Sequence, residues 1–225
     1  MTRATREQAS AELAKAAGCP GIAARLDPTL PDAARTLILA GLACFAADGY
    51  NATTTRDIAT RAGLSPAGMY VHFPSKADLL HRIVVTGHDA ILEALNAVVA
   101  STPDPCQRLR ALIAAFATLL AENYSAGRVT NYEYRYLPDG LRAPVDQQRL
   151  QIREIVRTAI SDGVSAGVFV AEDPDAAARA VISMCVDISR WYTDEQTVDP
   201  ATLGDTYGEL ALRLAGVRPA PEQEA

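Results

Sequence analysis

Side chains that can donate hydrogen bonds to phosphate or to base edges gather within residues 54–76. They are Thr54, Thr55, Arg56, Tyr70, His72 and Lys76. The two threonines stand at a predicted helix start, where hydroxyls, unpaired N–H groups and the helix dipole favour a phosphate. The spacing of the last three can place donors along one strand of phosphates. A pair of plainly capped helices would show the same features, so the chemistry favours a nucleic-acid contact without requiring one.

Catalytic groupings are not evident in the sequence. We find no nucleophile elbow, no Gly-rich phosphate loop and no paired catalytic carboxylates, so we expect no enzyme and no cofactor. His81 and His88 are seven residues apart on one predicted helix face and could bind a metal together with Asp89. A solvated or pocket-lining histidine pair is the alternative that we favour. The four cysteines form no CxxC pair, and we expect neither a disulfide nor a metal site.

The elements that carry these side chains have clear start and stop signals. A helix is predicted from Asp32, as N-cap, to about Asp48, and an eight-residue helix from Thr55 to Ala62 ends at Gly63. Ser65 and Pro66 open a third, short helix, because proline fits the first helical position. Ser75 caps a long helix from Lys76 to about Ala100. Two short helices joined by a three-residue turn have the spacing of a helix-turn-helix.

The residues between Ala34 and Leu80 closely resemble the N-terminal domain of TetR-family transcriptional regulators. The resemblance rests on Phe45, Gly49-Tyr50, Thr53-Thr54-Thr55-Arg56-Asp57-Ile58-Ala59, Ala62-Gly63-Leu64-Ser65, Met69-Tyr70-Val71-His72-Phe73, Lys76 and Leu79-Leu80. It implies an all-α homodimer with a three-helix DNA-binding head at 32–80 and a ligand-binding and dimerisation body at 81–217. Residues 1–31 would be an arm and linker, and residues 218–225 a disordered tail.

The resemblance also implies roles for individual residues toward a double-stranded DNA operator. Thr54 and Thr55 would contact phosphate, Arg56 would read a base, and Tyr70, His72 and Lys76 would contact the DNA backbone. Ser65, Pro66, Ala67 and Gly68 would form the base-facing start of the recognition helix. Because Pro66, Ala67 and Gly68 have no hydrogen-bonding side chains, readout would come from Arg56, Tyr70, thymine methyl contacts or DNA shape. A helical adaptor without DNA binding is the alternative. Arg3 and Arg6 could add minor-groove contacts.

Aromatic residues concentrate in the C-terminal part of the chain, and we expect some of them to line a pocket for a small hydrophobic effector. The predicted pocket residues are Phe116, Tyr132, Tyr136, Phe169, Met184, Arg190 and Trp191. Short segments around Asn131–Tyr136 and Arg190–Tyr192 loosely resemble the branch of the family that controls fatty-acid, steroid or aromatic-acid catabolism, which implies an acyl-CoA effector. Core and interface packing is the competing interpretation of these rings.

The last two predicted helices carry apolar stripes at helical spacing. One is Ala178, Val181, Ile182, Cys185, Ile188 and Tyr192, and the other is Leu203, Tyr207, Leu210 and Leu214. Together with a twofold copy they could form a four-helix bundle. Packing within the subunit's own core is the alternative, but the resemblance favours a homodimer through these helices.

Charge is distributed unevenly along the 225 residues. The net charge is −6, yet residues 1–86 hold 9 Lys+Arg against 7 Asp+Glu, and residues 87–225 hold 12 against 20. The acidity therefore lies in the body, and only a broadly cationic nucleic-acid binder is excluded. With no signal segment and no run of 18 apolar residues, we expect a cytoplasmic protein that does not contact a membrane.

Overall fold

The computed structural model describes residues 19, 21–193 and 195–217. Within these residues all regular elements are helical, and strand-like pairing is limited to one bridge between Phe169 and Val217. The predicted all-α class is confirmed. The helices are α2 (Ile22–Arg25), α3 (Asp32–Ala52), α4 (Thr55–Arg61), α5 (Pro66–His72), α6 (Lys76–Ser101), α7 (Pro105–Glu122), α8 (Tyr124–Arg128), the π-helix η1 (Val129–Glu133), the 3-10 helix η2 (Tyr134–Tyr136), α9 (Asp139–Ser165), α10 (Pro174–Trp191) and α11 (Pro200–Ala215).

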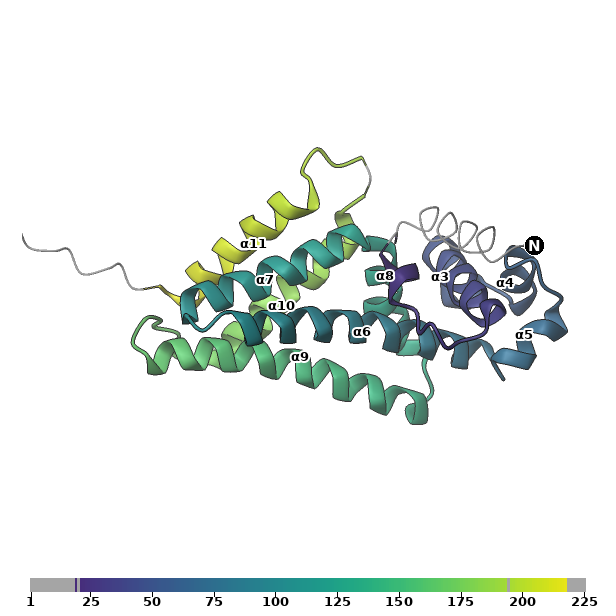
Figure 1. The fold of residues 1–225 in the computed structure, drawn as a ribbon, viewed down its shortest axis with the longest axis horizontal. Coiled ribbons are helices and arrows are strands. Elements are labelled where there is room, and N and C mark those ends of the chain that lie inside the picture. The colour runs from purple at the N-terminus through teal and green to yellow at the C-terminus, as the bar shows by residue number, and fades with distance from the viewer. Residues whose placement is uncertain (1–18, 20, 194, 218–225) are drawn as a thin grey trace, which may run out of the picture.

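The three helices α3, α4 and α5 form a head at one end of an elongated molecule (Figure 1). Side-chain caps predicted from the sequence set its short helices. Thr54 accepts a hydrogen bond from the backbone N–H of Asp57 at the start of α4, and Ser65 accepts one from Gly68 at the start of α5. Pro66 occupies the first turn of α5. Local sequence therefore positions both halves of the helix-turn-helix.

Helix α3 departs from the prediction at both ends. Pro31 rather than Asp32 is the N-cap, and Asp32 begins the helix. The helix does not stop at Asp48, because the chain kinks at Gly49 (φ 79°, ψ 164°) and continues helically to Ala52. That combination of angles is open almost only to glycine. Gly49 therefore reorients the last turn of α3 before α4 begins.

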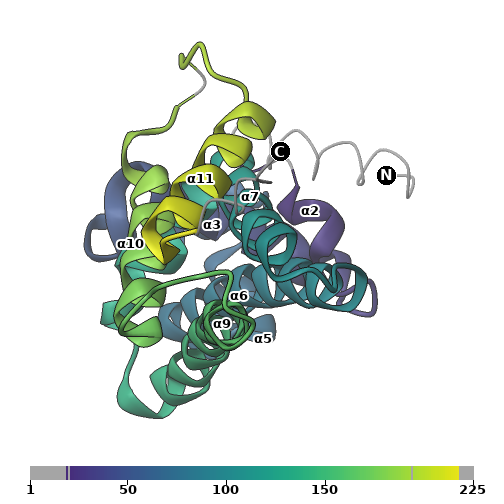
Figure 2. The same cartoon turned by 90° about the vertical axis from the view of Figure 1, so that its left-hand side faces the viewer.

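The body is built around α6, which runs from the head along most of the molecule beside α7 and α9 (Figures 1 and 2). By length and composition alone α6 could cross a membrane. Its apolar face, however, is buried in the molecule from Leu79 to Leu95, which is the usual state of a core helix. The body's other long helices, α10 and α11, pack against α7.

Helix α9 begins five residues earlier than the sequence suggested. In the sequence, Pro138-Asp139-Gly140 is a typical break and Pro144 a typical first residue of a helix, which together predict a helix start at about Pro144. In the structure Pro138 is the N-cap and Pro144 lies inside the helix. A proline early in a helix removes one backbone hydrogen bond of the helix. The burial of Val145 and Ile152 on one face of α9 favours a helix that continues through Pro144.

The described part of the expected linker, residue 19 and residues 21–31, is packed onto the body. It contains the single-turn helix α2, and Cys19, Ile22 and Leu26 are buried in the same core as α3. Arg25 pairs with Glu93 of α6 at 3.2 Å. This segment is therefore not a loose connection. Residues 1–18 of the expected arm, with Arg3 and Arg6, and the tail at 218–225 lie outside the described residues.

Candidate nucleic-acid interface and ligand cleft

Most of the predicted DNA-contacting residues lie in or beside the short helices α4 and α5, and several of them are exposed. Six of them are exposed: Thr54, Arg56, Ser65, Pro66, Ala67 and Tyr70. Four are partly buried: Thr55, Gly68, His72 and Lys76. The Tyr70 hydroxyl lies 3.4 Å from that of Thr55 and joins α5 to the start of α4. Val71, next to Tyr70, is 79% exposed and was missed by the sequence analysis. Its methyl groups add to a surface suited to thymine methyl contacts.

Thr54 acts first as a helix cap. Its backbone N–H and hydroxyl both donate to Asp57, at 2.9 and 2.6 Å, and these hydrogen bonds hold the pKa of the Asp57 carboxyl below its usual value. The first backbone N–H groups of a helix have no intrahelical partner. A phosphate at this end of α4 would therefore meet the N–H groups of Thr55 and Arg56, with the carboxylate of Asp57 limiting the positive potential.

Lys76 has a different role from the one predicted. Its ammonium donates to the carbonyl oxygens of Tyr50 and Thr53, each at 2.7 Å, and lies 4.2 Å from the centre of the Tyr50 ring. Burial lowers the pKa of Lys76 from its ordinary value. With two of its three donors used inside the head, Lys76 holds the connection between α3 and α4 and keeps one N–H for a phosphate.

A cleft of about 460 Å³ opens between α6, α7, α9 and α10. Apolar side chains cover part of it, and three arginines border it. It is lined by His88, Ile91, Phe116, Asn131, Asp146, Arg149, Leu150, Ile152, Arg153, Arg179, Ile182, Ser183 and Val186. Arg153 and Arg179 also pair with Asp175 of α10. The cleft thus offers a mostly apolar wall and an excess of positive charge to a ligand.

The predicted pocket residues do not come together, and among the seven only Phe116 lines this cleft. The other six lie elsewhere for separate reasons. Tyr136 stacks on Tyr50 of the head, Phe169 fills the space beside Gly163, and Arg190 pairs with Asp187 on the surface. Trp191 is 41% exposed at the end of α10 and Tyr132 and Met184 are half-buried away from the cleft lining. Aromatic clustering in sequence was therefore a poor guide to the pocket.

The arginines of the cleft were missed, although the sequence held a usable signal. Arg149 and Arg153 are four residues apart and flank the buried Ile152 on α9. Side chains four apart share a helix face. Basic residues on the edge of an apolar helical stripe indicate a charged border to a buried site. Arg179, on α10, joins them only through the tertiary fold.

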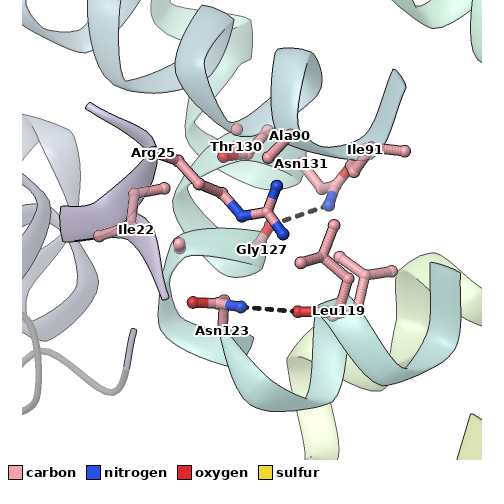
Figure 3. A pocket seen from close by; sticks show the side chains of 12 residues that line it. Ile22, Arg25, Ala90, Ile91, Leu119, Asn123, Gly127, Thr130 and Asn131 are labelled. Atoms are coloured by element: carbon pink, nitrogen blue, oxygen red, sulfur yellow. Dashed lines mark hydrogen bonds between the residues drawn. The ribbon is translucent and has the colours of Figure 1, made fainter. Parts of the chain in front are cut away.

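A smaller cavity of about 30 Å³, room for one or two water molecules, lies between α2, α6, α7 and η1. Figure 3 shows Ile22 and Arg25 of α2 on one side of it and Leu119 and Asn131 on the others. The Asn131 amide donates to the Gly127 carbonyl at 2.9 Å. Ile91 and Asn131 line both this cavity and the cleft. The start of η1 therefore lies between the two spaces.

His88 is 1% exposed at the wall of the cleft, with Nδ1 3.0 Å from the Val84 carbonyl oxygen. Burial lowers the pKa of His88 to about 4. Within the described residues no three His, Cys, Asp or Glu side chains are grouped to hold a metal ion. Asp89, considered with His81 and His88 as a metal ligand, instead accepts a hydrogen bond from Gln148 at 2.7 Å.

Protein stability should fall as the pH drops below about 6.5 because of His88. An unfolded histidine takes up a proton near pH 6.5, whereas the folded His88 resists protonation down to about pH 4. Its contribution is therefore present above pH 6.5 and is lost progressively toward pH 4, by roughly 2 kcal/mol at pH 5. Urea unfolding at pH 7 and pH 5 should show a smaller loss in His88→Gln than in the parent. An equal loss of unfolding free energy in both proteins would show that His88 does not dominate the pH dependence of stability between pH 7 and pH 5.

The apolar stripe predicted on α10 faces the subunit's own core. Ala178, Val181, Cys185 and Ile188 are fully buried within the subunit, so these four side chains pack in its own core, and a homodimer through the last two helices stays a prediction. On α11, Leu203 is also buried inside, whereas Leu214 is 49% exposed. Apolar surface near these helices comes instead from Val170, Trp191, Val198, Leu214 and Val217.

Comparison with known proteins places both parts of the chain. Residues 37–83 match the family model described as bacterial regulatory proteins, tetR family, and residues 102–215 match the Tetracyclin repressor-like, C-terminal domain. A regulatory protein of the tetR family from Rhodococcus RHA1 is 35% identical, with a TM-score of 0.80, over 84% of this chain and 100% of that one. The transcriptional repressor KstR2 of Mycobacterium tuberculosis is 27% identical over 78% of this chain and 88% of its own.

A further solved structure has the same fold at lower identity. It is AibR in complex with isovaleryl coenzyme A and operator DNA, 22% identical with a TM-score of 0.73, over 79% of this chain and 97% of that one. At this identity the likeness shows the fold alone.

Proposed function

The chain belongs to the TetR family of transcriptional regulators, which are not enzymes, and on this premise we propose that it is a repressor that a small ligand releases from a palindromic operator. The observation that supports this best is the exposed surface of the helix-turn-helix, to which Thr54, Arg56, Pro66, Ala67 and Tyr70 contribute exposed side chains, with the Tyr70 hydroxyl of α5 3.4 Å from that of Thr55 in α4. Such a regulator works in the cytoplasm.

Base recognition would rest on few polar groups. Among the exposed residues predicted to contact DNA, Arg56 is the one whose side chain can make a bidentate contact with guanine. Pro66, Ala67 and Val71 offer apolar surface to thymine methyl groups. With Lys76 largely engaged inside the head, each subunit has few phosphate contacts, and affinity would depend on two heads binding together.

The effector would be an amphipathic anion held in the cleft between α6, α9 and α10. Ile91, Phe116 and Ile152 provide an apolar wall, while Arg149 and Arg153 suit a carboxylate or phosphate. A fatty acyl group joined to coenzyme A has this chemistry. Calorimetry with isovaleryl coenzyme A, octanoyl coenzyme A and free coenzyme A tests the assignment. Binding of none of the three would contradict an acyl-CoA effector.

The homodimer would form through the outer surfaces of α10 and α11. Trp191 and Leu214 are 41% and 49% exposed there, and aromatic side chains such as that of Trp191 are enriched in interfaces. In Figure 2, α11 lies at the outside of the body next to α10. A twofold pair would place two recognition helices about one DNA turn, roughly 34 Å, apart.

A gel shift tests DNA binding directly. The purified dimer, mixed with DNA from upstream of its own gene, should give a retarded band at low salt, and the band should weaken as salt releases the phosphate contacts. Arg56→Ala should weaken it at least tenfold, because it removes the main base-reading side chain. Absence of a shift with folded dimer would exclude DNA binding at that site, and selection from random DNA would then decide whether any operator exists.

A further inference from the structure

We propose that residues 129–136, which form η1 and η2, transmit ligand binding in the cleft to the DNA-binding head, with Arg149 at the cleft end and Glu133 at the head end. The proposal rests on the proposed function in one respect, namely that the signal is an effector bound in the cleft. The coupling itself rests on contacts that join this segment to both sites.

At the head, Glu133 holds the kink of α3. Its carboxylate accepts a hydrogen bond from the backbone N–H of Tyr50 at 2.9 Å. Tyr50 directly follows Gly49, whose angles interrupt the helix, so its N–H needs an acceptor from outside the helical ladder. A side chain of the body therefore determines how the last turn of α3 is oriented, and α4 follows that turn after two residues.

Aromatic stacking strengthens the same junction. The rings of Tyr136 and Tyr50 stack with centroids 5.4 Å apart and planes 13° from parallel. Cations cover both outer faces, because Arg135 lies 4.9 Å from the Tyr136 ring and Lys76 lies 4.2 Å from the Tyr50 ring. Lys76 in turn donates to the carbonyl of Thr53, immediately before α4. Movement of η2 would therefore reach the start of α4 through Tyr50 and Lys76.

At the cleft, Arg149 contacts the same segment. Its guanidinium donates to the Asn131 side-chain oxygen at 3.4 Å and lies 4.5 Å from the Tyr134 ring. The hydrogen bond is long and therefore weak. Arg149 also lines the cleft, so an anionic ligand would compete for its donors. Such a ligand would take Arg149 from Asn131 and Tyr134 at little cost.

The segment between these ends has a backbone that can change register. Val129–Glu133 is a π-helix, a rare form often found at functional sites. Conversion to an α-helix would rotate the residues after it by about 100°, which would remove Glu133 from Tyr50. The Thr130 hydroxyl in this turn is buried with no hydrogen-bond partner, and a Cβ on Gly87 of α6 would lie 2.6 Å from it. The Thr130 hydroxyl therefore makes no hydrogen bond in the π-helix, and conversion to an α-helix would break none of its own.

Amide hydrogen exchange at Tyr50 in the full-length protein tests the coupling without any ligand. Glu133→Ala and Arg149→Ala should each raise the exchange rate at least tenfold. Two matched controls should not: Glu122→Ala removes an exposed carboxylate from α7, and Arg153→Ala removes a cleft arginine whose ion pair is with Asp175. Thermal unfolding confirms that each variant is folded. Equal Tyr50 exchange in Arg149→Ala and Arg153→Ala would overturn the proposal.

Operator release with isovaleryl coenzyme A as probe gives the second readout. In the parent, the probe should weaken operator binding at least tenfold. In Glu133→Ala it should bind as before by calorimetry but leave operator affinity unchanged within twofold, and Glu133→Gln, which keeps an acceptor oxygen, should restore the response. Parent-like release in Glu133→Ala would refute the coupling. If the probe does not bind the parent, the acyl-CoA assignment fails, and the Tyr50 exchange still decides the coupling.

Discussion

Gly49→Ala should reduce operator affinity at least tenfold and lower the stability of the head. The backbone at Gly49 has φ 79° and ψ 164°, a conformation that costs a residue with a Cβ on the order of 1–3 kcal/mol. Crowding is not the cause, because the nearest atom to an added Cβ is a Glu133 carboxylate oxygen at 3.9 Å, an ordinary contact. The strain would be relieved by a change in φ that moves Tyr50 away from Glu133 and shifts α4 with it.

Fluorescence anisotropy with labelled operator DNA measures this effect. Gly140→Ala is the matched control, since Gly140 lies in the first turn of α9, has no positive φ and meets no atom within 4 Å of an added Cβ. It should bind the operator as the parent does. If Gly49→Ala binds within twofold of the parent, the kink does not determine how the head presents α4 and α5.

Gly208→Ala should destabilise the body and weaken its dimer. Gly204 and Gly208 lie one turn apart on α11 and allow it to approach α7 closely. A Cβ at Gly208 would lie 2.7 Å from the backbone oxygen of Arg110, and one at Gly204 would lie 2.7 Å from that of Ala114. Alanine gains about 1 kcal/mol in helix propensity over glycine. Overpacking against backbone, which cannot rotate away, costs about 1–3 kcal/mol, and we expect it to prevail.

Thermal unfolding and light scattering check both parts of this prediction. The Tm should fall by several degrees, since about 1 kcal/mol corresponds to 2–4 °C in a chain of this size. The dimer should dissociate at higher protein concentration, because α11 supplies the proposed interface. Thr206→Ala, an exposed change on the same helix, should leave the Tm unchanged. A Tm at or above that of the parent would show that α7 and α11 separate without cost.

The head could be predicted from sequence because its determinants are local. Thr54 and Ser65 each cap a helix by accepting a hydrogen bond from the N–H group three residues later, and Pro66 and Gly63 act on their own backbone. Such signals need no knowledge of the tertiary fold. The same reasoning missed the role of Lys76, because its acceptors at Tyr50 and Thr53 lie more than twenty residues earlier.

The ligand cleft could not be predicted because it is made where four helices meet. Its residues come from α6, α7, η1, α9 and α10, up to about a hundred positions apart, and no local pattern links Phe116 to Arg149 or Arg179. Aromatic density indicated residues that do not line this cleft, since Tyr136 stacks on Tyr50 at the head junction and Phe169 packs beside Gly163. The sequence likewise could not predict whether the apolar stripe of α10 is buried in the subunit, because an apolar helix face fits a core as well as an interface.

Release of operator DNA by a ligand in the cleft tests the central claim most directly. A complex of the dimer with its labelled operator is titrated with isovaleryl coenzyme A, while calorimetry measures ligand binding to the same protein. We predict saturable loss of DNA binding at the ligand concentration that fills the cleft, and a shift to higher concentration in Arg153→Ala, which removes one of the arginines at the cleft border. Ligand that fills the cleft while operator affinity stays constant would contradict the account.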